Sequence, residues 1–130
     1  MNKSKIKICG IKDIKTLDCC INNKVNFFGL IFYKKSPRNI NLEDALELVK
    51  HSQNKLISSV GVFVNEPIDQ IKKILSKIKL DYIQLHGEEN YDYIKEIKKN
   101  DPVKIIKNIP INSSKDFLNI KNFNNIDMFL

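Results

Sequence analysis

The chain alternates six short apolar runs with five segments of helical periodicity. The apolar runs predict strands at residues 5–9, 27–32, 56–64, 82–85, 103–106 and 126–130. The segments between them predict helices at 13–22, 42–51, 67–78, 90–100 and 114–120. Because strict strand–helix alternation is typical of parallel strands joined by crossover helices, the sequence predicts an α/β fold with a parallel sheet.

Residues at the predicted helix ends support this division. Asn41 can accept a hydrogen bond from the first turn of the helix at 42–51. Asn65 is the candidate cap of the helix at 67–78. Asn23 can take the left-handed conformation that ends the first helix.

Two architectures fit the alternation. A doubly wound open sheet could be complete in 130 residues, whereas an eight-stranded barrel needs about 200 residues or more and would be truncated. Residues 126–130 have the pattern of a strand with no helix after it, which favours the barrel. Periodicity alone leaves both architectures open.

Three cysteines constrain the environment of the protein. Cys9, Cys19 and Cys20 are odd in number, and their spacing matches neither a disulfide framework nor a metal-binding pair. No apolar run approaches the roughly 20 residues that span a bilayer. We therefore expect reduced thiols in a cytoplasmic protein that does not bind a membrane.

The net charge of +7 comes from lysine, because 21 of the 22 basic residues are lysines and Arg38 is the only arginine. The lysines are spread along the whole chain and form no basic stripe with interleaved aromatic residues. This distribution favours a solvated surface over a nucleic-acid interface. The positive excess suits an anionic small-molecule partner.

Reactive and polar residues gather where the predicted strands end, which is where α/β proteins carry their reacting groups. The segments are KICGI (7–11), GLIF (29–32) with SPR (36–38), VGVFVN (60–65) and QLHGEE (84–89). In this order and at these spacings they closely resemble phosphoribosylanthranilate isomerase, over about the first two-thirds of such an enzyme.

The resemblance implies a single partial domain over residues 1–130, an incomplete (β/α)8 TIM barrel with about six parallel strands and five helices. It also implies an isomerase that converts N-(5-phosphoribosyl)anthranilate into 1-(2-carboxyphenylamino)-1-deoxyribulose 5-phosphate in tryptophan biosynthesis. This Amadori rearrangement needs no metal and no organic cofactor. The implied partner is a small phosphosugar, and the full enzyme is expected to be a monomer or homodimer.

The resemblance places the general base at Cys9 and the anthranilate-binding residue at Arg38. A proton next to an iminium is acidic enough for a positioned thiolate to remove it. Arginine offers a planar fork that binds a carboxylate with two hydrogen bonds and stacks on a ring, and lysine can do neither. A lone arginine in a strand-to-helix loop of a lysine-rich chain therefore indicates a site that needs this geometry.

Gln84 and His86 alternate along one predicted strand, so their side chains point to the same face. In a barrel this face is the interior and its mouth. The pair is expected either to bind substrate or to fix the upper layer of the barrel by a hydrogen bond. The other histidine, His51, lies at the polar end of a helix and is expected to be solvated.

Two parts of the family's site are expected beyond Leu130. The general acid of the family ends the sixth strand, whereas Asp127 lies at the start of that strand. The phosphate-binding loops follow strands seven and eight. The chain is therefore expected to be truncated at its C-terminus, inactive alone, and prone to self-association through open sheet edges.

The alternative is a complete flavodoxin-like α/β domain with a non-catalytic binding or regulatory role. Such a domain would place the strands in an open sheet with helices on both faces. The sequence has no acidic cluster after the first strand and no phosphate loop rich in Gly, Ser or Thr, which speaks against this alternative.

Overall fold

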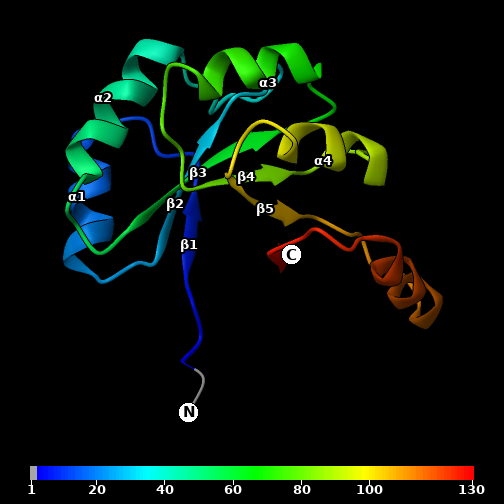
Figure 1. Cartoon of the computed structure of the whole chain (residues 1–130). Coiled ribbons are helices and arrows are strands. Elements are labelled where there is room, and N and C mark those ends of the chain that lie inside the picture. The colour runs from blue at the N-terminus through cyan, green and yellow to red at the C-terminus, as the bar shows by residue number, and fades with distance from the viewer. Residues whose placement is uncertain (1–2) are drawn as a thin grey trace.

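The computed structural model describes residues 3–130 and contains one curved sheet of six parallel strands (Figure 1). In chain order the strands are β1 (Lys7–Cys9), β2 (Phe27–Ile31), β3 (Ser58–Phe63), β4 (Tyr82–Leu85), β5 (Lys104–Lys107) and β6 (Met128–Phe129). The helices between them are α1 (Ile14–Asn22), α2 (Leu42–Ser52), α3 (Ile68–Leu75), α4 (Tyr91–Lys98) and the 3₁₀ helix η1 (Ser114–Asn122). The predicted elements are all present, and most of their bounds differ by only a few residues.

The strands follow one another across the sheet in the order β1-β2-β3-β4-β5-β6. Because every crossover moves to the next position in the same direction, its helix returns on the same face. Helices α1 to α4 accordingly lie along one side of the sheet (Figure 1). A flavodoxin-like sheet has the order 2-1-3-4-5 and helices on both faces, so that alternative is wrong. The arrangement is the wall of a (β/α)8 barrel, as predicted.

The face of the sheet that turns toward the helices holds the larger apolar core. The strands contribute fully buried side chains to it: Phe28, Leu30, Phe63, Ile83 and Ile105. The helices contribute their apolar stripes: Leu17, Ala45, Leu48, Ile71, Ile94 and Ile97. Burying a large apolar side chain contributes about 1.5–3 kcal/mol, so this layer is what fastens the helices to the wall.

The opposite face, which is the interior side of a barrel wall, carries a smaller apolar cluster. Its buried members are Phe27, Ile31, Val60, Val62 and Ile106. Cys9 and Tyr82 are partly buried against this cluster. Because side chains alternate along a strand, Gln84 faces the same side as Tyr82 and therefore as Cys9.

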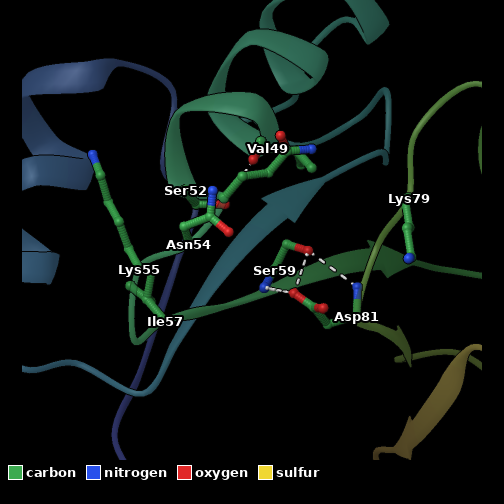
Figure 2. A pocket seen from close by; sticks show the side chains of 9 residues that line it. Val49, Ser52, Asn54, Lys55, Ile57, Ser59, Lys79 and Asp81 are labelled. Carbon is green, nitrogen blue, oxygen red and sulfur yellow. Dashed lines mark hydrogen bonds between the residues drawn. The ribbon is translucent and has the colours of Figure 1, made fainter.

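At the amino ends of the strands, polar side chains link neighbouring strands in pairs. In three places the residue before a strand accepts a 2.8 Å hydrogen bond from the backbone N–H at the start of the preceding strand: Asn26 from Ile6, Asp81 from Ser59, and Asp127 from Ile105. Figure 2 shows the second link beside a cavity of about 350 Å³, where the Ser59 hydroxyl also donates to Asp81. Asp127 thus lies at the start of its strand, as predicted, and at the opposite end of the sheet from Cys9.

The helix ends show which of the predicted terminal residues take the roles expected of them. Asn41 caps α2 as predicted, because its side-chain oxygen accepts a 2.8 Å hydrogen bond from the Asp44 N–H. The prediction for Asn23 is wrong, since its φ is −91° and the left-handed residue is Lys24, with a φ of 56°. The turn after α1 therefore reverses one residue later than the sequence indicates.

Two polar side chains make contacts that were not predicted. Asn65 does not cap α3, whose N-cap position is Pro67, without a side-chain hydrogen bond. Instead the Asn65 Oδ1 accepts a 2.8 Å hydrogen bond from the Glu88 N–H. His51 is not simply solvated, because its Nε2 lies 2.7 Å from the Asp18 Oδ1 and joins α2 to α1.

The segment before β6 is the least packed part of the wall. The predicted helix there is the 3₁₀ helix η1, and none of its residues is buried. Its apolar side chains Phe117 and Leu118 are 57% and 61% exposed, so no apolar stripe holds the segment in an α-helix against the sheet. Within residues 3–130, no helix has both the length and the apolar character to cross a membrane.

Candidate active site at the carboxyl ends of the strands

The first candidate side chain is Cys9, the last residue of β1. It pairs in register with Gly29 of β2, and a Cβ atom at position 29 would lie 2.8 Å from the Cys9 Sγ and 3.1 Å from its Cα. Glycine at position 29 therefore leaves the room that the thiol occupies. The Cys9 side chain is partly buried on the interior face of the wall.

Arg38 reaches back over the end of β1. Its Nη1 donates a 2.9 Å hydrogen bond to the Cys9 carbonyl oxygen, which uses one of the five guanidinium donors. Gly10 has a φ of 85°, and a Cβ there would lie 2.6 Å from the Arg38 Cδ. The turn therefore needs glycine both for its conformation and for this close approach. The only arginine of the chain is thus placed beside Cys9.

Gln84 and His86 lie on one face at the end of β4. The Gln84 Nε2 is 3.3 Å from the His86 Nδ1, and Gln84 is 3% exposed while His86 is exposed. The Gln84 Oε1 is buried and has no hydrogen-bond partner among residues 3–130. A buried acceptor left without a partner costs about 1–3 kcal/mol, so this oxygen is suited to a donor from a ligand.

The two pairs lie at the same end of the sheet, because parallel strands present their carboxyl ends at one edge. Strands β2 and β3 separate them, and no hydrogen bond joins one pair to the other in the part of the chain that the structure describes. The site therefore offers a thiol and a guanidinium on one side and an amide and an imidazole on the other. Among the described residues, no three His, Cys, Asp or Glu side chains gather into a group that could hold a metal ion.

A buried ion pair beside this site was missed by the sequence-based prediction. Lys107 at the end of β5 and Glu89 before α4 form a 3.0 Å salt bridge, and their side chains are 4% and 1% exposed. The Glu89 Oε1 also accepts a 2.8 Å hydrogen bond from the Asn65 N–H. The one signal that could have revealed the pair is register. Lys107 follows Ile105 by two residues and so faces the helix side of the sheet, where a charge needs a partner.

Comparison with known proteins points to one family. Residues 6–130 match the family model of N-(5'phosphoribosyl)anthranilate (PRA) isomerase. The N-(5'-phosphoribosyl)anthranilate isomerase of Clostridium acetobutylicum is 37% identical over 126 residues, which cover 97% of this chain and 58% of that protein. The enzyme of the same name from Caldanaerobacter subterraneus is 36% identical over 126 residues, which cover 97% and 59%. The chain thus spans less than two-thirds of the length of these relatives.

Solved structures agree with the fold. The phosphoribosylanthranilate isomerase of Thermotoga maritima superposes with a TM-score of 0.85 at 28% identity, over 97% of this chain and 60% of that chain. A crystal structure of phosphoribosylanthranilate isomerase in complex with reduced 1-(o-carboxyphenylamino)-1-deoxyribulose 5-phosphate gives a TM-score of 0.85 at 27% identity, over 98% and 66%. From the family match, the relatives and the shared fold, the chain belongs to the N-(5'-phosphoribosyl)anthranilate isomerase family.

Proposed function

We propose that the protein is an isomerase that converts N-(5-phosphoribosyl)anthranilate into 1-(2-carboxyphenylamino)-1-deoxyribulose 5-phosphate in tryptophan biosynthesis. The observation that carries the proposal is the placement of Cys9 and Arg38 together at one strand end, in a chain of this family. The chain spans 58% of its relative from Clostridium acetobutylicum, so the reaction of the whole protein is inferred by similarity.

Cys9 is proposed to act as the general base. Protonation and opening of the sugar ring give an iminium, and the neighbouring C2 proton becomes acidic. The thiolate form of cysteine can take this proton, after which the enolamine collapses to the ketone. The position of Cys9 at the carboxyl end of β1 supports this role, since barrel enzymes bind their substrates at that end of the strands.

Arg38 is proposed to bind the anthranilate carboxylate. One guanidinium N–H is used on the Cys9 carbonyl, and the remaining donors of this exposed side chain, which make no hydrogen bond within residues 3–130, can form a two-bond pair. Because the anchoring carbonyl belongs to the residue that carries the proposed base, carboxylate binding would set the substrate directly beside the thiol.

Gln84 and His86 are proposed to contact the sugar part of the substrate. The buried Gln84 Oε1 needs a donor, which a sugar hydroxyl or the substrate amine can supply. The contact between the Gln84 Nε2 and the His86 Nδ1 orients the imidazole, so that its Nε2 is left for the substrate. The unpartnered oxygen favours this role over that of a pair which only fixes the barrel layer.

Turnover of N-(5-phosphoribosyl)anthranilate by the whole protein tests these roles. Cys9→Ser is expected to lower kcat by on the order of 10²–10⁴ with little change in KM. Arg38→Ala is expected mainly to raise KM, because it removes binding of the carboxylate. Cys19→Ser is the matched control, since this exposed thiol lies on α1, outside the site. Unchanged turnover in either site variant would contradict the corresponding assignment.

The proposed partner is a small phosphosugar rather than a nucleic acid or a membrane, in the cytoplasm. A solved relative from Thermotoga maritima is described as a dimeric isomerase, which supports a homodimer as well as a monomer for the whole protein. Strands β1 and β6 each have a neighbour on one side only within the described sheet. Open edges of this kind pair readily with other chains, so we include self-association in the proposal.

A further inference from the structure

The segment that carries His86, residues 86–89, is held on one side by Lys107. The ammonium group donates a 2.6 Å hydrogen bond to the Gly87 carbonyl and makes a longer contact of 3.4 Å with the Leu85 carbonyl. These two carbonyls flank His86 in the chain. The third donor of the ammonium goes to the Glu89 Oε2 at 3.0 Å. Lys107 therefore uses two of its three hydrogens on the backbone on either side of His86 and the third on the Glu89 carboxylate.

The loop after β3 holds the same segment from the other side. The second Glu89 oxygen accepts a 2.8 Å hydrogen bond from the Asn65 N–H, and the Asn65 Oδ1 accepts one of 2.8 Å from the Glu88 N–H. A Cβ at Gly87 would collide with the Asn65 side chain, so the segment passes this amide too closely for any larger residue. The His86 N–H is itself bonded to the last carbonyl of β3, at 2.9 Å.

The burial of the Glu89–Lys107 pair indicates a geometric role. Taking a carboxylate and an ammonium out of water is unfavourable, and apolar residues of similar volume often give equal or greater stability. We propose that this pair is a positioning device that holds His86, and through it the bonded Gln84 amide, at the mouth of the site. The inference rests on the proposed function, in which the His86 imidazole meets the substrate.

Three variants separate positioning from stability. Lys107→Met leaves the Glu89 carboxylate buried without its ion-pair partner, whereas Glu89→Gln/Lys107→Met removes both charges and keeps the acceptor for the Asn65 N–H. Lys72→Met is the matched control, because the Lys72–Glu96 pair has side chains that are 35% and 39% exposed. The measurements are the thermal unfolding midpoint, kcat and KM for N-(5-phosphoribosyl)anthranilate, and the NMR signals of the His86 ring in the full chain.

Lys107→Met is expected to lower the unfolding midpoint, and the double variant is expected to regain most of the loss. The double variant should nevertheless keep displaced His86 ring signals and a kcat/KM lowered by on the order of 10–10², because small misplacements of binding groups have effects of this size. Lys72→Met should leave the His86 signals and kcat/KM unchanged.

A double variant that does not fold, or that has unshifted His86 signals, would overturn the inference, because the pair would then serve stability alone. The variant His86→Ala distinguishes a failure of this inference from a failure of the proposed function. If His86→Ala leaves kcat/KM intact while the double variant still displaces the His86 signals, the substrate contact is wrong and the positioning role stands.

Discussion

Replacing Gly29 with alanine should displace the Cys9 thiol without removing any chemical group from the site. The new Cβ would lie 2.8 Å from the Cys9 Sγ and 3.1 Å from its Cα, and ordinary contacts begin at 3.4 Å. Because the Cα belongs to the backbone, rotation of the thiol alone cannot relieve the crowding, and β1 has to move. Overpacking of this kind costs about 1–3 kcal/mol, or roughly 3–12 °C in the unfolding midpoint of a domain of this size.

Gly61→Ala provides a control that also introduces short contacts, but on the face of the sheet away from the Cys9 thiol. Its Cβ would lie 2.6 Å from the Leu80 Cδ1 and 3.1 Å from the Phe63 Cε2, on the side of the sheet that faces the helices. Both variants are expected to lower the unfolding midpoint, Gly61→Ala by less, because its close contacts are ends of side chains that can rotate away. Only Gly29→Ala should change the position and accessibility of the Cys9 Sγ.

The assay is the rate at which Cys9 reacts with a thiol reagent. It is run in a Cys19→Ser background, where Cys20 stays buried at 6% exposure and does not compete. Gly29→Ala should change the labelling rate severalfold and lower turnover, whereas Gly61→Ala should do neither. A labelling rate equal to that of the parent in Gly29→Ala, or an equal change in Gly61→Ala, would refute the reasoning.

Two further predictions concern stability and assembly. Burial raises the pKa of Asp127, but the hydrogen bonds from the Ile105 N–H and Lys98 outweigh it, so the pKa lies below its usual value. The stabilisation that it provides is therefore present above the usual carboxyl range and is lost as the pH falls through the folded-state pKa. Unfolding free energies of Asp127→Ala and the parent should converge on acidification, and a gap that persists in acid would contradict this. Sedimentation of the 130-residue chain should depend on concentration because of the edges of β1 and β6; a monomer that melts cooperatively would count against edge pairing.

The positions of the strands could be predicted because buried strands need short runs of apolar residues. All five residues of β2 are buried, and a strand covered on both faces must be apolar throughout. Periodicity could not decide the order of the strands, since a doubly wound sheet has the same alternation. The four strand-end segments decided it, because together they resemble one family, and that resemblance implied the barrel.

Contacts between distant loops could not be predicted from local sequence. Asn65 has the residue type and position of a helix cap, yet its side chain bonds a backbone N–H 23 residues away. Lys107 is one of 21 lysines, and although its register after Ile105 indicates a buried position, nothing near it in the sequence indicates Glu89 as its partner. In both cases the partner belongs to the segment after β4, whose path is set by tertiary packing rather than by propensity. The prediction for Asn23 was wrong for a smaller reason, since the left-handed residue of the turn after α1 lies one position later.

The three side-chain links at the amino ends of the strands join β1 to β2, β3 to β4 and β5 to β6, and each closes a stretch of only 20 to 22 residues. Loops of this length close at a modest loss of chain entropy. The register of each strand–helix–strand unit is therefore fixed by a contact that lies within that unit. The sheet is in this sense a series of three two-strand units, β1–β2, β3–β4 and β5–β6, each with its own polar link at the amino end.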